Sequence, residues 1–306
     1  MAKTPNTYHH IVPKCYLKHF AVKDRSDYVF VYDKIRNKTY TQPIDSIGGK
    51  EDFYSIKSAD DGSYDKNVIE KEVLAKNLER DYSDVLGKTI DAISNGVQIS
   101  DELRNSLAVH VAIQFLRLKE VREKDEETLN EIMPKMIRLF KHGLAIEKNN
   151  PQIADLEIDY KYDSALYHYQ SSFGNDDVVN TFAGQLALNY WNFYFSSSPV
   201  FYTSTFPIVV KAHVPNVRPL CMGLTQYGAE LSFPISSNIM LVIWDREYFK
   251  KKSETDGNII TATDEDIRKY NWLRYFYADQ VYSKTNDFSI LDFIFMIKGK
   301  HEFLKY

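Results

Sequence analysis

The stretch "NDDVVNTFAGQLALNYWNFYF", residues 175–195, decides the fold class because the pattern of the chain changes where this stretch ends. Asn175 or Asp176 can cap a helix at its start. Apolar residues then recur at helical spacing: Val178, Phe182, Leu186 and Trp191. Four short runs rich in β-formers follow it, bounded by Pro, Gly, Ser and Asn: "PVFYTS", "PIVVKA", "AELSFPI" and "NIMLVIW". The pattern predicts one helix over the whole stretch and a sheet after it.

Working outward, helical patterns dominate the chain before this stretch. They predict helices over 13–20, from about Asp65 to Asn95, over 101–124, and over 125–148 with a bend or restart at Pro134. A hairpin is expected in "DYVFVYDKIRNKTYTQ", because β-formers flank a polar turn.

Helices and strands are largely segregated along the chain, and this predicts the α+β class. We expect a predominantly helical fold with a small, mostly antiparallel sheet in the C-terminal half. No linker or repeat is evident, so a single domain is predicted over 1–306. It would be mainly helical over 60–195 and β-rich over 199–245, and a helix over 264–277 would close it.

Composition narrows the class of protein. The chain has 306 residues with a net charge of -4, so no overall positive field draws it to nucleic acid, although a local basic groove stays open. The start lacks the apolar core of a signal peptide, and no apolar run is long enough to span a bilayer. With only Cys15 and Cys221, we expect a cytoplasmic protein with free thiols and no membrane partner.

The stretch "YHHIVPKCYLKHFA", residues 8–21, gathers three histidines and a cysteine. His9 and His10 are adjacent, so their side chains diverge in most backbone conformations. The spacing matches no zinc motif, and the metal stays unknown. Either one histidine bonds the backbone and seats this segment, or one acts as an acid, a base or a ligand.

The helix predicted over 101–124 carries a polar line. It is apolar on nearly all sides, which is typical of a buried helix. Yet Ser106, His110, Gln114 and Arg117 recur at spacings of four, four and three, and therefore share one face. The line is either the solvent edge of a core helix or one wall of an internal polar pocket. In such a pocket Arg117 could hold a carboxylate or phosphate while Gln114 orients it.

Two further features carry polar groups. Thr203, Ser204 and Thr205 end a predicted strand before a proline, where hydroxyl groups can line a site or satisfy a turn. No GxSxG motif surrounds Ser204, so a nucleophile of that kind is not supported. Asn271 lies among aromatic and basic residues on a predicted helix, a mixture that suits either base stacking or core packing.

The order of these motifs resembles the microbial family called domain of unknown function 4238. The resemblance rests on "HHIVPKCYLKHFA", "IEKEVLAKNLE", "QFLRLKEVR", "FYTSTFP", "LSFPIS" and "NWLRYFYADQVYS". It implies a set of positions to watch: His9, His10, Pro13, Gln114, Arg117, Ser204, Pro207, Pro234 and Asn271. The family usually has "TSDxP" where this chain has "TSTFP", so Thr205 replaces an acid. If that acid is a metal ligand or a base in relatives, the activity is altered here.

Taken together, these features predict a hydrolase of a phosphate-containing substrate, nucleic acid or nucleotide, and the role of a toxin or phage-defence effector would suit such an enzyme. The predicted catalytic residues are His9, His10, Arg117 and Asn271. The predicted ligand-binding residues are His110, Gln114, Thr203, Ser204 and Thr205. A histidine would transfer the proton and Arg117 would stabilise the anionic transition state. A divalent metal stays open as cofactor. The alternative is a module that binds an anionic ligand or a protein partner without turnover.

Overall fold

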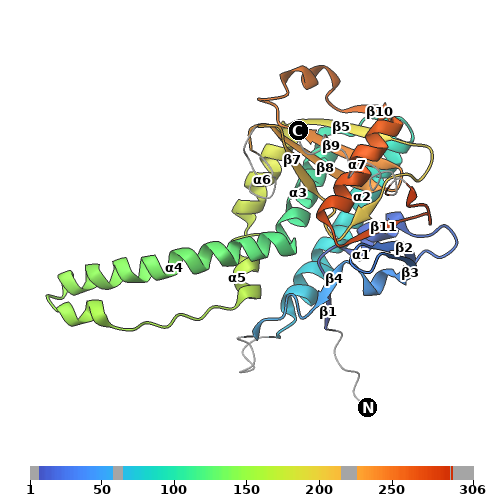
Figure 1. Ribbon diagram of the computed structural model, residues 1–306. Coiled ribbons are helices and arrows are strands. Elements are labelled where there is room, and N and C mark those ends of the chain that lie inside the picture. Colours follow the sequence, from blue (N-terminus) through green and yellow to red (C-terminus); the bar gives the residue numbers. More distant parts are fainter. Residues whose placement is uncertain (1–6, 58–64, 215–225, 290, 292–306) are drawn as a thin grey trace, which may run out of the picture.

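A five-stranded sheet forms the core of the folded body (Figure 1). The structure is a computed structural model, and it describes residues 7–57, 65–214, 226–289 and 291. The strand order is β10-β5-β9-β8-β7. The strands are β5 (Tyr190–Phe195), β7 (Val209–Ala212), β8 (Ala229–Ser236), β9 (Ile239–Trp244) and β10 (Asn258–Thr261). Neighbouring strands are antiparallel except for β10, which runs parallel to β5.

Helices cover both faces of this sheet, and therefore every residue of β8 and β9 is buried. One face packs on α2 (Glu79–Ser94), α3 (Asp101–Leu116) and α6 (Asp176–Leu188), and the other packs on α7 (Asp264–Tyr277). Side chains alternate between the two cores. Leu241 of β9 faces the three helices, whereas Met240 and Val242 face α7.

Two smaller sheets tie the N-terminal segment to the rest of the chain. The four-stranded sheet has the order β3-β2-β11-β6. Its strands are β2 (Tyr28–Asp33), β3 (Lys38–Pro43), β6 (Thr203–Ser204) and β11 (Gln280–Ser283). The predicted hairpin is β2–β3, and Asn37 adopts a positive φ of 50° at its turn. A further pair joins β1 (Tyr8–His10) to β4 (Gly49–Glu51). The α+β class is confirmed, but the sheets are not confined to the C-terminal half as predicted.

The helix predicted over 175–195 is wrong in its last third. The helix α6 ends at Leu188, and 190–195 form strand β5. Asn189 leaves the helix with an extended ψ of 167°, and the backbone N–H of Trp191 then bonds the Asp256 carboxylate. Six register pairs with β9 supply partners for the aromatic run, so tertiary pairing overrides the local pattern.

The other helices follow the predictions with shifted boundaries. Near the start lie α1 (Lys14–Leu17) and the 3₁₀ helices η1 (Lys18–Phe20) and η2 (Ile44–Ser46); η7 (Lys250–Thr255) precedes β10. A π-helix, η4 (Ile69–Leu78), leads directly into α2. The boundary predicted between the helices 101–124 and 125–148 lies earlier, at Arg117–Leu118, where Leu118 is extended with ψ 144° and buries its side chain. The restart predicted at Pro134 does not occur, because α4 continues through it. No helix of the described ranges is both long enough and apolar enough to cross a membrane.

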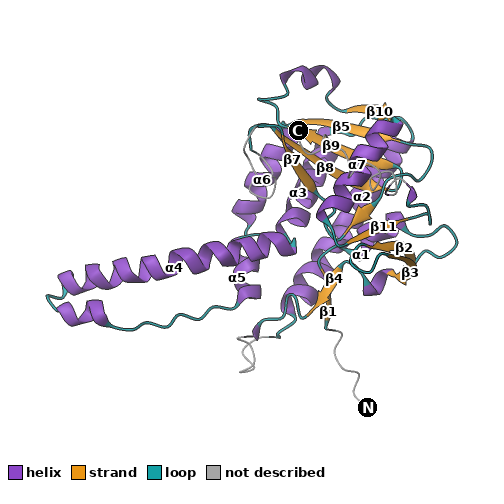
Figure 2. Cartoon of the chain, viewed as in Figure 1, coloured by secondary structure: helices purple, strands orange, loops and turns teal. Residues whose placement is uncertain are grey.

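An arm projects from this body. It comprises α4 (Lys119–Glu147), the 3₁₀ helix η5 (Pro151–Asp155) and an extended return to α5 (Ser164–Ser171). Figure 2 shows that the arm contains helix and loop, while the strands gather in the body. Pro134 lies inside α4 without ending it. The turns around it are supported by the return, because Met133 and Ile137 are half-buried and Asn130 accepts a hydrogen bond from Tyr160.

Candidate functional site

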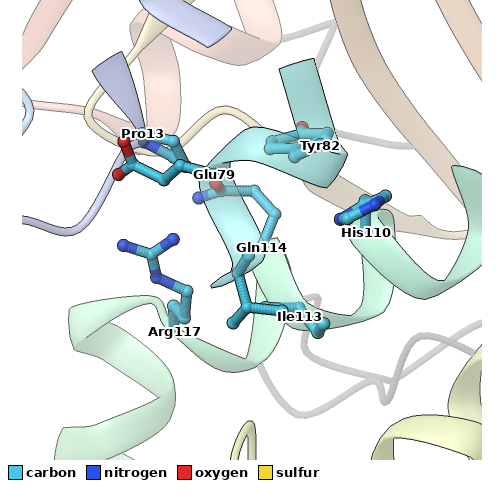
Figure 3. A pocket seen from close by; sticks show the side chains of 8 residues that line it. Pro13, Glu79, Tyr82, His110, Ile113, Gln114 and Arg117 are labelled. Atoms are coloured by element: carbon cyan, nitrogen blue, oxygen red, sulfur yellow. The ribbon is translucent and has the colours of Figure 1, made fainter. Parts of the chain in front are cut away.

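A small pocket lies between the start of α2 and the end of α3 (Figure 3). It is lined by Pro13, Leu78, Glu79, Tyr82, His110, Ile113, Gln114 and Arg117. The space in it that a water-sized molecule can occupy is about 10 Å³. A cavity needs roughly 10–15 Å³ of such space to hold one water molecule, so a group as large as a phosphate enters only when lining side chains move. The π-helix η4 ends at its edge, and π-helical turns are frequent at functional sites.

The polar line of α3 turns inward to form one wall of this pocket. His110, Gln114 and Arg117 are only 4%, 1% and 2% exposed, and all three line the pocket. Ser106, the first member of the line, is half-buried and bonds the carbonyl of Glu102 in the preceding turn. Three of the four polar side chains therefore face an internal pocket rather than solvent.

Arg117 is fixed by two neutral acceptors. Its Nη2 donates to the carbonyl oxygen of His10 at 2.6 Å, and its Nε donates to the Tyr54 hydroxyl at 3.3 Å. Burial opposes the charge of Arg117, whereas Tyr54 and two nearby glutamates raise the pKa of its guanidinium. One of these glutamates, Glu79, reaches into the space beside Arg117 and Gln114 (Figure 3). The pocket thus holds a fixed positive charge with a carboxylate next to it.

The N-terminal histidines reach this site through their backbone. His10 offers its carbonyl to Arg117 and its N–H to a Glu70 oxygen at 3.4 Å, while its ring packs on Tyr8 at 5.2 Å. Burial is the main reason why the pKa of the His10 imidazole falls to about 4. Neither this imidazole nor that of His9 lines the pocket.

His9 seats the N-terminal segment. Its Nδ1 accepts a hydrogen bond from the backbone N–H of Tyr54 at 2.8 Å, and the two rings stack at 6.0 Å. Burial lowers the pKa of the His9 imidazole, so the neutral ring is favoured. This is the anchoring role that the sequence left open for one histidine.

The histidine that lines the pocket is His110. Its Nε2 lies 3.0 Å from an Asp81 oxygen, and its ring stacks on Tyr82 at 4.7 Å. Because a carboxylate accepts hydrogen bonds, the proton is assigned to Nε2 and the basic lone pair to Nδ1. Burial lowers the pKa of His110 and Asp81 opposes this, so the imidazole is mainly neutral at pH 7.

Several buried polar atoms around the pocket have no hydrogen-bond partner in the described chain. They include the Tyr82 hydroxyl and Gln114 Oε1, both on lining residues, and Oε2 of nearby Glu70. The Gln114 amide is otherwise satisfied, since its Nε2 donates to the carbonyl of Ile11 at 3.3 Å. Burial raises the pKa of Glu70. Orphaned groups cost stability when buried, and they cluster where a ligand atom could bond them.

Thr203, Ser204 and Thr205 lie elsewhere and do not line the pocket. The Tyr16 hydroxyl lies 2.7 Å from Thr203 Oγ1. The Ser204 hydroxyl donates to the carbonyl of Phe206 at 2.8 Å and accepts from its N–H at 3.1 Å. The backbone N–H of Thr205 bonds a carbonyl of β11 at 3.1 Å. The geometry here is that of a turn before Pro207.

Asn271 also lies outside the pocket and acts as a clamp on the chain before β6. Its Oδ1 accepts from the Tyr202 N–H at 2.9 Å, and its Nδ2 donates to the Val200 carbonyl at 2.7 Å. Both bonds go to backbone groups of one segment, and the residue is completely buried. The structure therefore does not bring Asn271 together with His10 and Arg117.

Sequence reasoning did not assign Tyr54, Tyr82 or Asp81 to the site. Tyr82 follows Glu79 by three residues and so shares its helix face, which is the one local signal that links it to the pocket. Tyr54 follows β4 in an irregular segment and carries no such signal.

The described residues include no group of three or more His, Cys, Asp or Glu side chains placed to hold a metal ion. Cys15 has a free thiol whose pKa is raised to about 12 by burial and nearby Glu79. Cys221 lies outside the described residues.

The fold and the site define an α+β protein with a small buried polar pocket between two helices and the N-terminal segment. The sequence model of the family described as "Protein of unknown function (DUF4238)" matches residues 8–287, and the chain therefore belongs to this family. The match confirms the resemblance seen in the motifs, and it includes every residue that lines the pocket. Comparisons with curated proteins and with solved structures gave no match.

Proposed function

We propose that the chain is a hydrolase whose pocket receives the phosphate group of a nucleotide or a short nucleic acid. The observation that carries the proposal is the inward polar line of His110, Gln114 and Arg117 on the buried helix α3. A fixed guanidinium, an unpartnered hydroxyl and a neutral imidazole with an orienting carboxylate then share one small space.

The pocket residues divide the chemistry among them. His110 Nδ1 removes a proton from a water molecule, whose oxygen forms a bond to phosphorus as the ester P–O bond breaks. The leaving oxygen takes a proton back from the imidazolium, so the ring ends as it began. Arg117 offsets the negative charge that grows on the phosphoryl oxygens, and the Tyr82 hydroxyl donates to one of them.

Glu79 restricts the substrate. A carboxylate beside Arg117 repels a doubly charged phosphate monoester more than a singly charged phosphodiester, which favours the diester. A net charge of -4 gives no general attraction for long nucleic acid. Both points favour a cyclic or linear diester of a few nucleotides.

A binding module without turnover is the second candidate. Two of the Arg117 nitrogens are already bonded to the protein, which suits a permanent anion site as well as a catalytic one. In this case the pocket holds a small anion and no ester bond breaks.

The test compares two tyrosine variants. Tyr82→Phe removes an unpartnered hydroxyl in the pocket, whereas Tyr16→Phe removes a buried hydroxyl that bonds Thr203 outside it. We expect Tyr82→Phe to weaken the binding of inorganic phosphate in calorimetry at least fivefold while the melting temperature stays the same. Tyr16→Phe should lower the melting temperature and leave the affinity for inorganic phosphate unchanged.

Hydrolysis is then measured with bis(p-nitrophenyl) phosphate and with short DNA and RNA strands, using the wild type and His110→Gln. Cleavage that His110→Gln abolishes supports the hydrolase. Phosphate binding without cleavage supports the binding module. If neither inorganic phosphate nor bis(p-nitrophenyl) phosphate binds the wild type at millimolar concentration, both proposals fail.

A further inference from the structure

A second group of charged side chains lies on the α7 side of the central sheet, whereas the pocket helices α2 and α3 cover the other face. At its centre is Glu230 of β8, whose side chain is 0% exposed. One Glu230 oxygen lies 2.7 Å from His213 Nε2, and the other lies 2.6 Å from Lys269 Nζ. We call this group the Glu230 cluster, and it comprises Lys211, His213, Glu230, Lys252 and Lys269.

The His213 imidazole is held in place with one nitrogen left for a ligand. In the neutral ring Nε2 carries the proton, because a carboxylate only accepts hydrogen bonds, and Nδ1 keeps its lone pair. The Phe249 ring lies edge-on at 5.0 Å, and the Tyr248 hydroxyl donates to the His213 carbonyl at 3.3 Å. No described residue bonds Nδ1, and the His213 side chain is 24% exposed. Nδ1 can therefore accept a hydrogen bond from a molecule in solvent.

Two lysines of the cluster lack a carboxylate of their own. Lys211 lies opposite Glu230 in the β7–β8 register and is half-buried, and Lys252 places its ammonium 4.3 Å from the centre of the Trp244 ring. Neither ammonium forms an ion pair within the ranges that the structure describes. Burial lowers the pKa of the Lys211 ammonium, and Lys269 acts in the same direction while Glu230 opposes it. An anion beside these lysines would thus be stabilised.

The other carboxylates near the cluster bond to backbone groups or lie in solvent. Asp245 is buried and accepts from two backbone N–H groups, at 2.9 and 3.0 Å. Asp266 forms the capping box of α7 with Thr263. Exposed charges of both signs surround the cluster: Glu247, Lys250, Lys251, Glu254 and Glu265. No carboxylate of the described chain therefore takes the place of an anion at Lys211 and Lys252.

Two exposed aromatic rings lie beside His213. Tyr248 is 41% exposed, and its ring centre lies 6.3 Å from that of the imidazole. Tyr227 is 61% exposed, and its ring lies 5.4 Å from that of Tyr248. Exposed aromatic rings next to cations are typical of sites that stack a base and bind its phosphate.

We propose that the Glu230 cluster binds a ribonucleotide. Lys211 and Lys252 bind the phosphate, His213 Nδ1 accepts a hydrogen bond from a ribose hydroxyl, and the base lies on the exposed tyrosine rings. A ligand that satisfies all three needs an anion, a hydroxyl donor and an aromatic ring, which a ribonucleotide combines. The inference goes beyond the proposed function, because it concerns the opposite face of the sheet and no bond is broken there.

The first test follows the ring Cε1–H signal of His213 by NMR while adenosine 5′-monophosphate is added to the full chain. The variant His213→Gln identifies this signal among those of the eight histidines. We expect a saturable shift, with inorganic phosphate and adenosine each binding at least tenfold more weakly. A signal that millimolar nucleotide does not move overturns the proposal. Phosphate that binds as tightly as the nucleotide overturns the role of the rings, and adenosine that does so overturns the role of the lysines.

The second test repeats the titration with variants. Lys211→Met and Lys252→Met should each weaken binding of the nucleotide at least fivefold, and the control Lys38→Met on exposed β3 should not. Tyr227→Leu should weaken binding of the nucleotide and leave that of inorganic phosphate unchanged. Tyr82→Phe alters the pocket alone, so an unchanged shift of His213 in this variant separates the two sites. Unchanged affinity in both lysine variants, or loss of the shift in Tyr82→Phe, overturns the assignment.

Discussion

Glu230 is the most deeply buried carboxylate on the α7 side of the central sheet, and its ion pairs make a sharp prediction. Its side chain is 0% exposed, and its two oxygens lie 2.7 Å from His213 Nε2 and 2.6 Å from Lys269 Nζ. Two other cations face it, Lys211 on β7 and Arg274 on α7. Burial raises the pKa of Glu230, but the hydrogen bonds and charges of His213 and Lys269 outweigh burial and lower the pKa from 4.5 to about 2.

The magnitude follows from linkage between protonation and folding. Each pKa unit corresponds to about 1.4 kcal/mol, so a folded pKa of about 2 against 4.5 unfolded contributes about 3 kcal/mol to stability at neutral pH. Because the folded pKa is the lower one, this stability is complete above pH 4.5. It is lost progressively as the pH falls from 4.5 toward 2.

The assay is urea unfolding of the wild type and Glu230→Gln at pH 7, 4.5 and 2.5. We expect the variant to lose about 3 kcal/mol at pH 7 and the difference between the two proteins to shrink at pH 2.5. The control is Glu247→Gln, since Glu247 is 66% exposed and only 3.9 Å from Arg246, where an ion pair contributes little. A difference that stays constant between pH 7 and pH 2.5 refutes the reasoning, because it would come from packing rather than from charge.

Three further substitutions test the structural roles assigned above, each by urea unfolding at pH 7. Asn271→Ala removes two buried bonds to the backbone and should cost about 2–4 kcal/mol; a loss below 1 kcal/mol would contradict the clamp. Arg117→Met leaves the half-buried Glu70 and Glu79 without their cation and removes two buried hydrogen bonds, which should cost about 3–5 kcal/mol, whereas an unchanged stability would show that the charge is solvated. Ser100→Ala removes the N-cap hydroxyl that accepts a hydrogen bond from the Leu103 N–H, and should lower the free energy of unfolding by about 1 kcal/mol. An unchanged free energy would mean that this cap does not stabilise α3.

Elements with strong local signals could be predicted from the sequence. The helix α7 spans 264–277 as predicted, because Thr263 and Asp266 form a capping box that fixes its start. The β2–β3 hairpin is likewise local, since its turn residue Asn37 tolerates the positive φ. In both cases residues a few positions apart determine the structure.

The strand β5 could not be predicted because its information is not local. Residues 190–195 read as a continuation of an apolar helix, and a strand buried on both faces lacks the alternation that would identify it. The residues that pair with β5 lie 44–54 positions later in β9 and 66 positions later in β10.

The pocket likewise combines a local sequence pattern with partners that are distant in the sequence. His110, Gln114 and Arg117 share a helix face, so their grouping follows from spacing alone. Their partners come from β1 and α2, and no short-range pattern pairs the carbonyl of His10 with a guanidinium 107 positions away. The hydroxyl residues before Pro207 satisfy their own turn, which is why their polarity did not indicate the pocket.

Thr205 stands at the position where the family resemblance implies an acid, and the structure makes the consequence testable. The residue is half-buried, its backbone N–H is bonded to β11, and neither it nor its neighbours line the pocket. An acid at this position therefore has no direct path to a ligand beside Arg117. We expect Thr205→Asp to change the unfolding free energy by less than about 1 kcal/mol, as for a partly exposed turn position.

The same variant should bind inorganic phosphate with the affinity of the wild type and cleave a phosphodiester at the same rate. A gain of activity in Thr205→Asp would show that position 205 reaches the reacting group. The set of residues assigned to the pocket would then be incomplete. Unchanged affinity together with unchanged cleavage would place the acid of the relatives in the turn rather than in the chemistry. The replacement by threonine would then be no sign of a lost activity in this chain.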